Sequence, residues 1–182
     1  SYLGTRLDQP NGARLIITSG GTESNHQALT GLSDHGPLVL SRIEHPSVLA
    51  TAKWLEQRGR SLRWLEVDQD GLIRMDQLET LISADDHGIT LVSLMSANNE
   101  TGVIQPISQA AEICRKADIP LHVDATQTVG KLPLNLKDSG ISALTFTAHK
   151  FHGPAGVGGL WLAPEVKVEA VFHGGEQQLE TR

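Results

Sequence analysis

Short apolar runs alternate with longer amphipathic segments along this chain, and the two patterns predict strands and helices. Strands are expected at Arg14–Ser19, Leu38–Ile43, Leu62–Val67, Thr90–Ala97, Pro120–Ala125, Ala143–Ala148 and Leu160–Ala163. Helices are expected at Thr22–Leu32, Ser47–Gln57, Met75–Ile82 and Ile107–Lys116. Strands that are apolar throughout and separated by helices favour an α/β fold, with a mostly parallel sheet covered by helices on both faces. Such a sheet binds ligands beyond the carboxyl ends of its strands.

Composition narrows the class of protein and the class of partner. The 182 residues are 39% hydrophobic and 20% charged, which is ordinary for a soluble protein and enough for one domain with a sizeable core. The net charge of −6, without a block of Lys and Arg, argues against nucleic acid and anionic membranes as partners. No apolar run approaches the length of a membrane span. The single cysteine excludes an intrachain disulfide and indicates a reducing, cytoplasmic setting.

Lys150 carries the strongest chemical signal, because it ends an apolar run that leads into a glycine-rich turn (ISALTFTAHKFHGPAGVGG). A lysine at the end of a buried strand can be desolvated, which makes the neutral amine easier to form. A neutral amine forms a Schiff base with an aldehyde, so Lys150 is a candidate anchor for pyridoxal 5′-phosphate (PLP). A lone lysine at a strand end is more often a surface residue, and motifs upstream decide between the two interpretations.

The segment RLIITSGGTESNHQAL predicts a strand, a Gly20-Gly21 turn and then a helix with Thr22 as its N-cap. Free N–H groups and the positive end of the helix dipole form an anion site at such a turn, where glycine lets the backbone approach closely. The Walker and dinucleotide-binding glycine patterns are both absent from the sequence. Alone, this motif is more often only a turn.

Asp124 follows the buried run of Ile119–Gln127 (IPLHVDATQ), so its carboxylate needs a cationic partner or several donors. The protonated pyridine nitrogen of PLP is one such partner, and its charge sustains the ring as an electron sink. Gln127 could donate a hydrogen bond to the phenolic oxygen of the ring. The alternative is that Asp124 caps a helix or pairs with an arginine.

Two further motifs follow predicted strands. His45 in IEHPSV precedes a proline and is therefore biased to an extended backbone, from which its imidazole could stack on a cofactor ring or transfer protons. In SANNETGVI, Asn98 and Asn99 enter a turn with Gly102. Their amides either serve the turn or point at a cofactor or a substrate carboxylate.

Cys114 lies on an apolar stripe with Ile107, Ala110 and Ala111 in the helix predicted over Ile107–Lys116. Position on such a stripe indicates packing in the core. No neighbour in the sequence would obviously activate the thiol, so we assign it no catalytic role.

Taken together, SGGTESN, EHPSV, NNETG, HVDATQ and HKFHGP occur in the order found in cysteine desulfurases. The chain thus resembles that family, within the class V aminotransferase group of PLP enzymes, from Arg14 to Gly175. The resemblance implies a fold type I PLP-dependent transferase large domain and a reaction that converts cysteine to alanine with a persulfide on the enzyme. It also implies sulfur transfer of the kind used in iron–sulfur cluster assembly, a homodimer and a sulfur-acceptor protein.

The resemblance further implies roles for individual residues. Lys150 would hold PLP as a Schiff base and later move the substrate Cα proton, while His45 would stack on the ring and share in catalysis. The remaining residues would bind the cofactor. Asp124 would meet the pyridine nitrogen, Gln127 and Asn99 the phenolic oxygen, and Gly21, Thr22, Thr147 and His149 the phosphate. No metal-binding residues are expected.

The resemblance is partial, because the nucleophilic cysteine and the substrate-binding arginine of the family belong to a C-terminal region that does not occur in this sequence. We therefore expect residues 1–182 to be a single PLP-binding large-domain fragment, without the family's opening segment and C-terminal small domain, and to be inactive alone. The segment GGEQQLETR also departs from the family's glycine-rich pattern. A related PLP-dependent lyase or aminotransferase, and a non-catalytic PLP-fold binding module, remain as alternatives.

Overall fold

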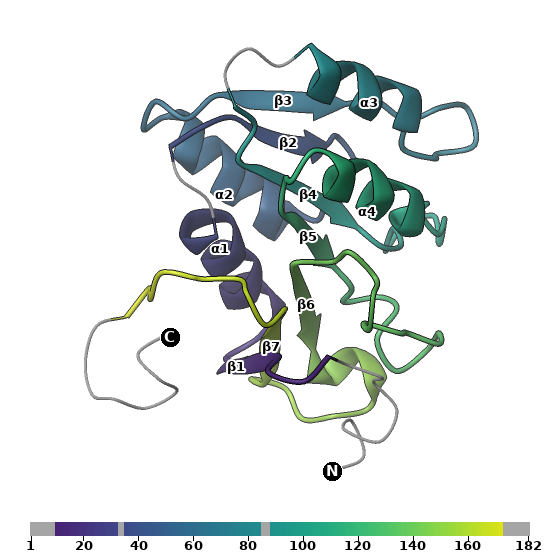
Figure 1. Ribbon diagram of the computed structural model, residues 1–182. Helices are drawn as coiled ribbons and strands as arrows, with labels where there is room; N and C mark the ends of the chain where they lie inside the picture. The colour runs from purple at the N-terminus through teal and green to yellow at the C-terminus, as the bar shows by residue number, and fades with distance from the viewer. Residues whose placement is uncertain (1–9, 33–34, 85–87, 173–182) are drawn as a thin grey trace.

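The computed structural model describes residues 10–32, 35–84 and 88–172, and Figure 1 shows their arrangement. The strands are β1 (Arg14–Thr18), β2 (Leu38–Ser41), β3 (Leu62–Leu65), β4 (Leu91–Met95), β5 (Leu121–Asp124), β6 (Ala143–Thr147) and β7 (Gly158–Leu162). The helices are α1 (Gly21–Gly31), α2 (Pro46–Glu56), α3 (Met75–Ser83) and α4 (Ile107–Lys116), with a short 3₁₀ helix, η1, at Ala148–Phe151.

The described strands form a single sheet in the order β1-β7-β6-β5-β4-β2-β3. The pairs from β6 through β5, β4 and β2 to β3 are all parallel, whereas β7 runs antiparallel to both β6 and β1. The expectation of a mostly parallel sheet is therefore confirmed. The reversal at β7 was not predicted, and it follows from the connection, since only η1 and a turn separate β6 from β7 and a parallel crossover needs a longer segment.

Helices cover both faces of the sheet, as expected from strands that are apolar on both sides. One core packs α1 and α2 against the sheet, through residues such as Leu29, Leu40 and Ala52. A second core packs α3 and α4 against the opposite face, through residues such as Leu78 and Leu94. Figure 1 shows α1 beside α2 on one side and α3 with α4 on the other.

Element ends differ from the expected ones where capping decides them. Helix α1 begins at Gly21 with Gly20 as its N-cap, so the prediction of Thr22 as N-cap is wrong. The backbone at Gly20 has φ 156°, which a glycine adopts readily and which starts the helix one residue earlier. Pro46 occupies the first turn of α2, as expected for a residue without an N–H. Within the described residues, no helix combines the length and the apolar character needed to cross a membrane.

Candidate functional site

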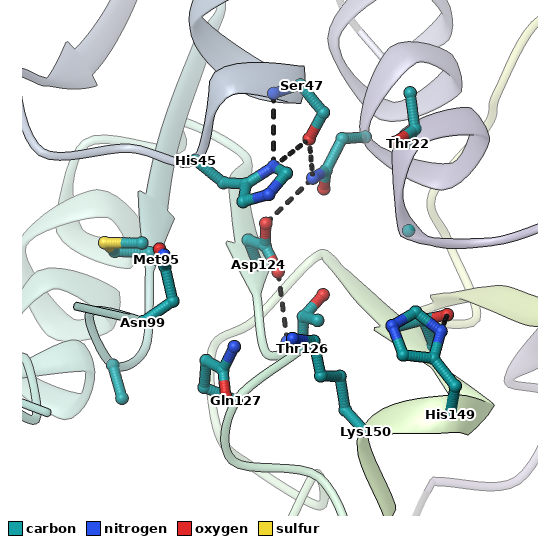
Figure 2. Close-up of a pocket in the computed structure, with 14 residues that line it drawn as sticks. Thr22, His45, Ser47, Met95, Asn99, Asp124, Thr126, Gln127, His149 and Lys150 are labelled. Carbon is teal, nitrogen blue, oxygen red and sulfur yellow. Dashed lines mark hydrogen bonds between the residues drawn. The ribbon is translucent and has the colours of Figure 1, made fainter. Parts of the chain in front are cut away.

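A pocket of about 190 Å³ opens at the carboxyl ends of β1, β2, β4, β5 and β6. The parallel strands bring the predicted motifs to this edge of the sheet, as the ligand-binding rule for α/β sheets anticipates. All nine predicted site residues line it, namely Gly21, Thr22, His45, Asn99, Asp124, Gln127, Thr147, His149 and Lys150. Figure 2 shows Asp124 between Thr22 and His149 on one side and Asn99 and Met95 on the other. The proximity was predicted, and the individual roles remain predictions.

Asp124 is held by neutral donors at the end of β5. The residue is 5% exposed, its Oδ2 accepts from Asn25 Nδ2 at 2.8 Å, and its Oδ1 accepts from Thr126 N at 3.0 Å. The alternatives of helix capping and of pairing with an arginine are not seen among its hydrogen bonds in the described chain. Two donors leave acceptor capacity on a buried carboxylate, which suits a cationic partner supplied by a ligand.

Asn25 and Ser47 join Asp124 to His45 in a hydrogen-bonded chain (Figure 2). The Asn25 amide donates to Ser47 Oγ at 2.9 Å as well as to Asp124. Ser47 Oγ then lies 2.8 Å from Nδ1 of His45, and the Ser47 backbone N–H donates to that same nitrogen at 3.1 Å. Because Nδ1 accepts from the backbone N–H of Ser47, the ring N–H of His45 is placed on Nε2.

His45 occupies the N-cap position of α2, with φ −58° and ψ 147°. The extended backbone expected from the following proline is therefore confirmed, although β2 itself ends earlier, at Ser41. Capping fixes the ring by its Nδ1 and leaves the exposed imidazole facing the pocket.

The first turn of α1, Thr147 and His149 form the other side of the pocket. Helix N-termini present N–H groups without partners inside the helix, so Gly21 and Thr22 lie where an anion is favoured. Thr147 is buried and its Oγ1 lies 3.1 Å from Nδ1 of His149, which orients that ring. The Thr147 hydroxyl donates to Val157 O at 3.2 Å, so the helix N-terminus, the Thr22 hydroxyl and the His149 imidazole are the donors suited to phosphate.

Lys150 lines the pocket, but the local structure that places it there differs from the expected strand end. Strand β6 ends at Thr147, and Lys150 sits within η1 as an exposed side chain rather than at the end of a buried strand. The chain turns here because Gly153 N donates to Ala148 O and Ala148 N donates to Val157 O. The desolvation argument for Lys150 is therefore wrong for the described chain, whereas its position in the pocket stands.

The two asparagines after β4 have different tasks. Asn98 serves the turn, since its Oδ1 accepts from the backbone N–H groups of Glu100 and Thr101. Asn99 is exposed and lines the pocket. The turn interpretation is thus confirmed for Asn98, whereas the cofactor interpretation stays a prediction for Asn99.

Gln127 lies after β5 and lines the pocket, but its Oε1 accepts from Lys131 Nζ at 2.9 Å. Its Nε2 group remains the donor that a phenolic oxygen would require. The interaction with Lys131 therefore fits the expected role, because it takes up only the acceptor end of the amide.

Five pocket residues were not anticipated from the sequence: Asn25, Ser47, Met95, Ala97 and Thr126. Asn25 is four residues after Gly21 on α1, so it lies one turn from the predicted anion site and on the same side of the helix. Ser47 follows the Pro46 that opens α2. Helical spacing from Gly21 was thus a usable signal for Asn25, while Met95 and Ala97 look like ordinary strand residues.

Cys114 is part of the core, as its place on the apolar stripe predicted. It is fully buried on α4, it does not line the pocket, and burial raises the pKa of its thiol to about 12. A thiol of this kind is almost entirely protonated at neutral pH and is a poor nucleophile. Elsewhere in the described residues, no cluster of three or more His, Cys, Asp or Glu side chains could hold a metal ion.

Gly158 allows β7 to pack against the turn that begins α1. A Cβ at this position would lie 2.6 Å from the backbone of Gly20. We expect Gly158→Ala to destabilise the chain by about 1–3 kcal/mol, because neither backbone can move away without disturbing the sheet. Thermal unfolding measures this. Gly21→Ala, whose Cβ would lie 3.3 Å from Thr126 Oγ1, is expected to lose less stability. Equal losses of stability in the two variants would contradict the role of the Gly20–Gly158 contact.

Comparison with known proteins identifies the group to which this architecture belongs. The aminotransferase class-V family model matches residues 7–181. The chain belongs to this family. The membership of the class V aminotransferase group that the motifs predicted is thereby confirmed.

Similar curated relatives include cysteine desulfurases. The chain is 40% identical over 173 residues to cysteine desulfurase IscS of Dictyoglomus turgidum, a match that covers 92% of this chain and 43% of that protein. It is also 40% identical over 168 residues to cysteine desulfurase IscS of Histophilus somni, covering 88% and 41% of the two chains. The chain therefore spans less than half the length of these relatives.

Solved structures agree in fold. A NifS-like protein superposes with a TM-score of 0.86 at 36% identity, covering 93% of this chain and 47% of the other. SspA in complex with cysteine superposes with a TM-score of 0.85 at 34% identity, covering 92% and 50%. The sheet and helices described above are thus those of cysteine desulfurase-like members of the class-V family.

Proposed function

We propose that the pocket binds PLP and that the chain is the cofactor-binding large domain of a cysteine desulfurase. One observation carries the proposal: Lys150, the buried carboxyl of Asp124 and the first turn of α1 line the same pocket. An amine for an aldehyde, an acceptor for a pyridinium and an anion site for a phosphate are the three groups that PLP requires of a protein. The family's PLP chemistry and the cysteine desulfurase relatives support this assignment.

Each group of pocket residues would bind a different part of the cofactor. Asp124, held by Asn25 and Thr126, would accept from the pyridine nitrogen and stabilise its positive charge. The first turn of α1, with Thr22, Thr147 and His149, would hold the phosphate. Gln127 and Asn99 would serve the phenolic oxygen, and the imidazole of His45 would contact the ring.

PLP, when bound, supplies an electron sink that makes bonds at the Cα and Cβ positions of an amino acid easier to break. Lys150 would hold the cofactor and would carry the Cα proton of the substrate. The position of His45, fixed through Nδ1 by Ser47, leaves Nε2–H available as a proton donor at the pocket.

Cysteine is the proposed substrate, and a relative by structure, SspA, was solved in complex with cysteine. The sulfur would pass to a cysteine thiol of the complete enzyme as a persulfide and then to an acceptor protein, with alanine as the second product. We also propose a homodimer, a cytoplasmic setting and a contribution to iron–sulfur cluster assembly, as expected for this type of desulfurase. The assignment of residues 1–182 to a single large domain belongs to the same proposal.

Replacing Asp124 with asparagine separates cofactor capture from chemistry. In Asp124→Asn, the introduced amide oxygen still accepts from Asn25, whereas one of two hydrogen bonds and the negative charge are lost. We expect PLP binding, followed by absorbance during titration, to weaken about tenfold. In a chain with the full length of the relatives, we expect removal of the substrate Cα proton to slow by roughly a hundredfold, because the developing charge loses its partner.

Exposed Asp70, which does not line the pocket, provides the matched control as Asp70→Asn. Equal turnover in Asp124→Asn and in the unaltered protein would contradict the pairing of Asp124 with the ring. Absence of any spectral change when PLP is added to the unaltered chain would contradict the proposed function as a whole and favour a binding module that does not use the cofactor.

A further inference from the structure

Glu44 is a buried carboxyl beside the pocket to which the proposed chemistry gives no task. It is 4% exposed, and it directly precedes His45 in the turn between β2 and α2. One carboxyl oxygen, Oε1, accepts from Ser41 Oγ and from the backbone N–H of Met95, the latter at 3.0 Å. The other oxygen, Oε2, is buried and has no hydrogen-bond partner among the described residues. Burying a charged carboxylate with one oxygen unpartnered costs free energy of folding, and protonation of the carboxyl lowers this cost.

The side chain of Glu44 connects two walls of the pocket. Its backbone belongs to the turn that presents His45, and its Oε1 reaches Met95 at the end of β4. Met95 lines the pocket, as does Asn99 beyond it. A carboxyl in this position sets the distance between the His45 turn and the end of β4, because the bond to Met95 crosses between neighbouring strands.

The charged groups around Glu44 favour its neutral form. Asp124, on β5, acts on it with a charge of the same sign. On the β3 side, the exposed side chain of Arg42 forms an ion pair with Glu66, with 2.6 Å between Arg42 Nε and Glu66 Oε1. His122, two residues before Asp124, is buried, and burial lowers the pKa of its imidazole to about 4. Burial and the charge of Asp124 together raise the pKa of Glu44 to about 8, against the hydrogen bonds from Ser41 and Met95.

We propose that Glu44 is a positioning residue that holds a proton at neutral pH and ties the turn carrying His45 to the end of β4. A proton on Glu44 removes the like-charge repulsion between this carboxyl and Asp124, which lines the pocket. The inference rests on the proposed function for its relevance to PLP, but the state of Glu44 can be measured without the cofactor.

Ionisation of Glu44 is expected to appear in the NMR signal of its own donor. In the unaltered chain, the Met95 amide resonance should titrate with a midpoint near pH 8. In Glu44→Gln, which keeps the shape and an acceptor oxygen but cannot ionise, this titration should disappear. Glu66→Gln, which changes an exposed carboxyl, should leave it in place. A Met95 resonance that titrates alike in the unaltered chain and in Glu44→Gln would overturn the proposal.

The free energy of unfolding provides a second readout of the proton. The pKa of Glu44 is raised in the folded chain, so its contribution to stability is fully present below the ordinary value of 4.5 and is lost as the pH rises to about 8. Relative to Glu44→Gln, the unaltered chain should therefore lose stability across that pH range. A difference between the two chains that does not change with pH would contradict a buried proton on Glu44.

Positioning is tested by PLP titration at neutral pH. Glu44→Ala leaves the Met95 N–H without its acceptor, and we expect about tenfold weaker binding of PLP. Glu44→Gln should bind within about twofold of Glu66→Gln. A folded Glu44→Ala chain that binds PLP as tightly as the unaltered one would overturn the positioning role, and if that variant does not fold, a large loss of binding in Glu44→Gln would overturn it. Failure of the unaltered chain to bind PLP contradicts the proposed function, whereas the NMR titration still decides the state of Glu44.

Discussion

The 182-residue chain is expected to release no sulfide from cysteine above the background of free PLP, even with excess PLP and a reductant. Desulfuration by the proposed route requires a thiolate that reaches the sulfur of a bound substrate. The sequence contains one cysteine, Cys114, which is fully buried on α4 and does not line the pocket. Burial raises the pKa of its thiol to about 12, so the thiolate is very sparsely populated at neutral pH. Loss of a positioned nucleophile removes much of the advantage of an enzyme.

A sulfide assay with Cys114→Ser as the matched variant decides this point. Both chains should give the background rate of free PLP with cysteine. Sulfide release at an enzymatic rate that Cys114→Ser abolishes would show that Cys114 acts as the nucleophile. It would overturn both the assignment of Cys114 to the core and the expectation that the chain alone is inactive.

Replacing Lys150 is expected to abolish covalent capture of PLP. Among the lysines in the described residues, Lys150 is the one that lines the pocket with Asp124. In Lys150→Ala, we expect the mass of a borohydride-reduced PLP adduct to disappear from the intact protein, because no other lysine of the described residues lines the pocket. Reversible binding through the phosphate site of α1 and Thr147 should persist with lower affinity.

Lys131 supplies the matched control, since it is an exposed lysine that bonds to the pocket residue Gln127 at 2.9 Å. Lys131→Ala should retain the reduced adduct in full. Adduct formation that survives in Lys150→Ala and is lost in Lys131→Ala would exchange the roles of these two lysines and refute the assignment.

The arrangement of the site was largely predictable because the topology of a parallel sheet brings distant motifs to one edge. Asp124 ends β5, while His45 and Lys150 follow β2 and β6, and the apolar strands could be read from the sequence. Order along the chain does not reveal the strand order, in which β4 lies between β2 and β5. Placement at the carboxyl edge could nevertheless be inferred without knowing which strands are neighbours.

Features set by side-chain packing and local turns were harder to predict from the sequence. The exposure of Lys150 depends on η1, a 3₁₀ turn for which the run TAHKFHGP gives no periodic signal. The start of α1 at Gly21 depends on the backbone at Gly20, which Gly158 allows to pack closely. Glu44 was not predicted as part of the site, because its burial and its bond to Met95 arise from tertiary contacts between β2 and β4.

The central claim is that this pocket binds PLP through Lys150, and site mapping on the unaltered chain tests it most directly. The chain is incubated with PLP, reduced with borohydride and digested, and the modified peptide is sequenced by mass spectrometry. We expect the label on Lys150, in the peptide that joins β6 to β7. A label on Lys53, Lys116 or another lysine, with none on Lys150, would contradict the account.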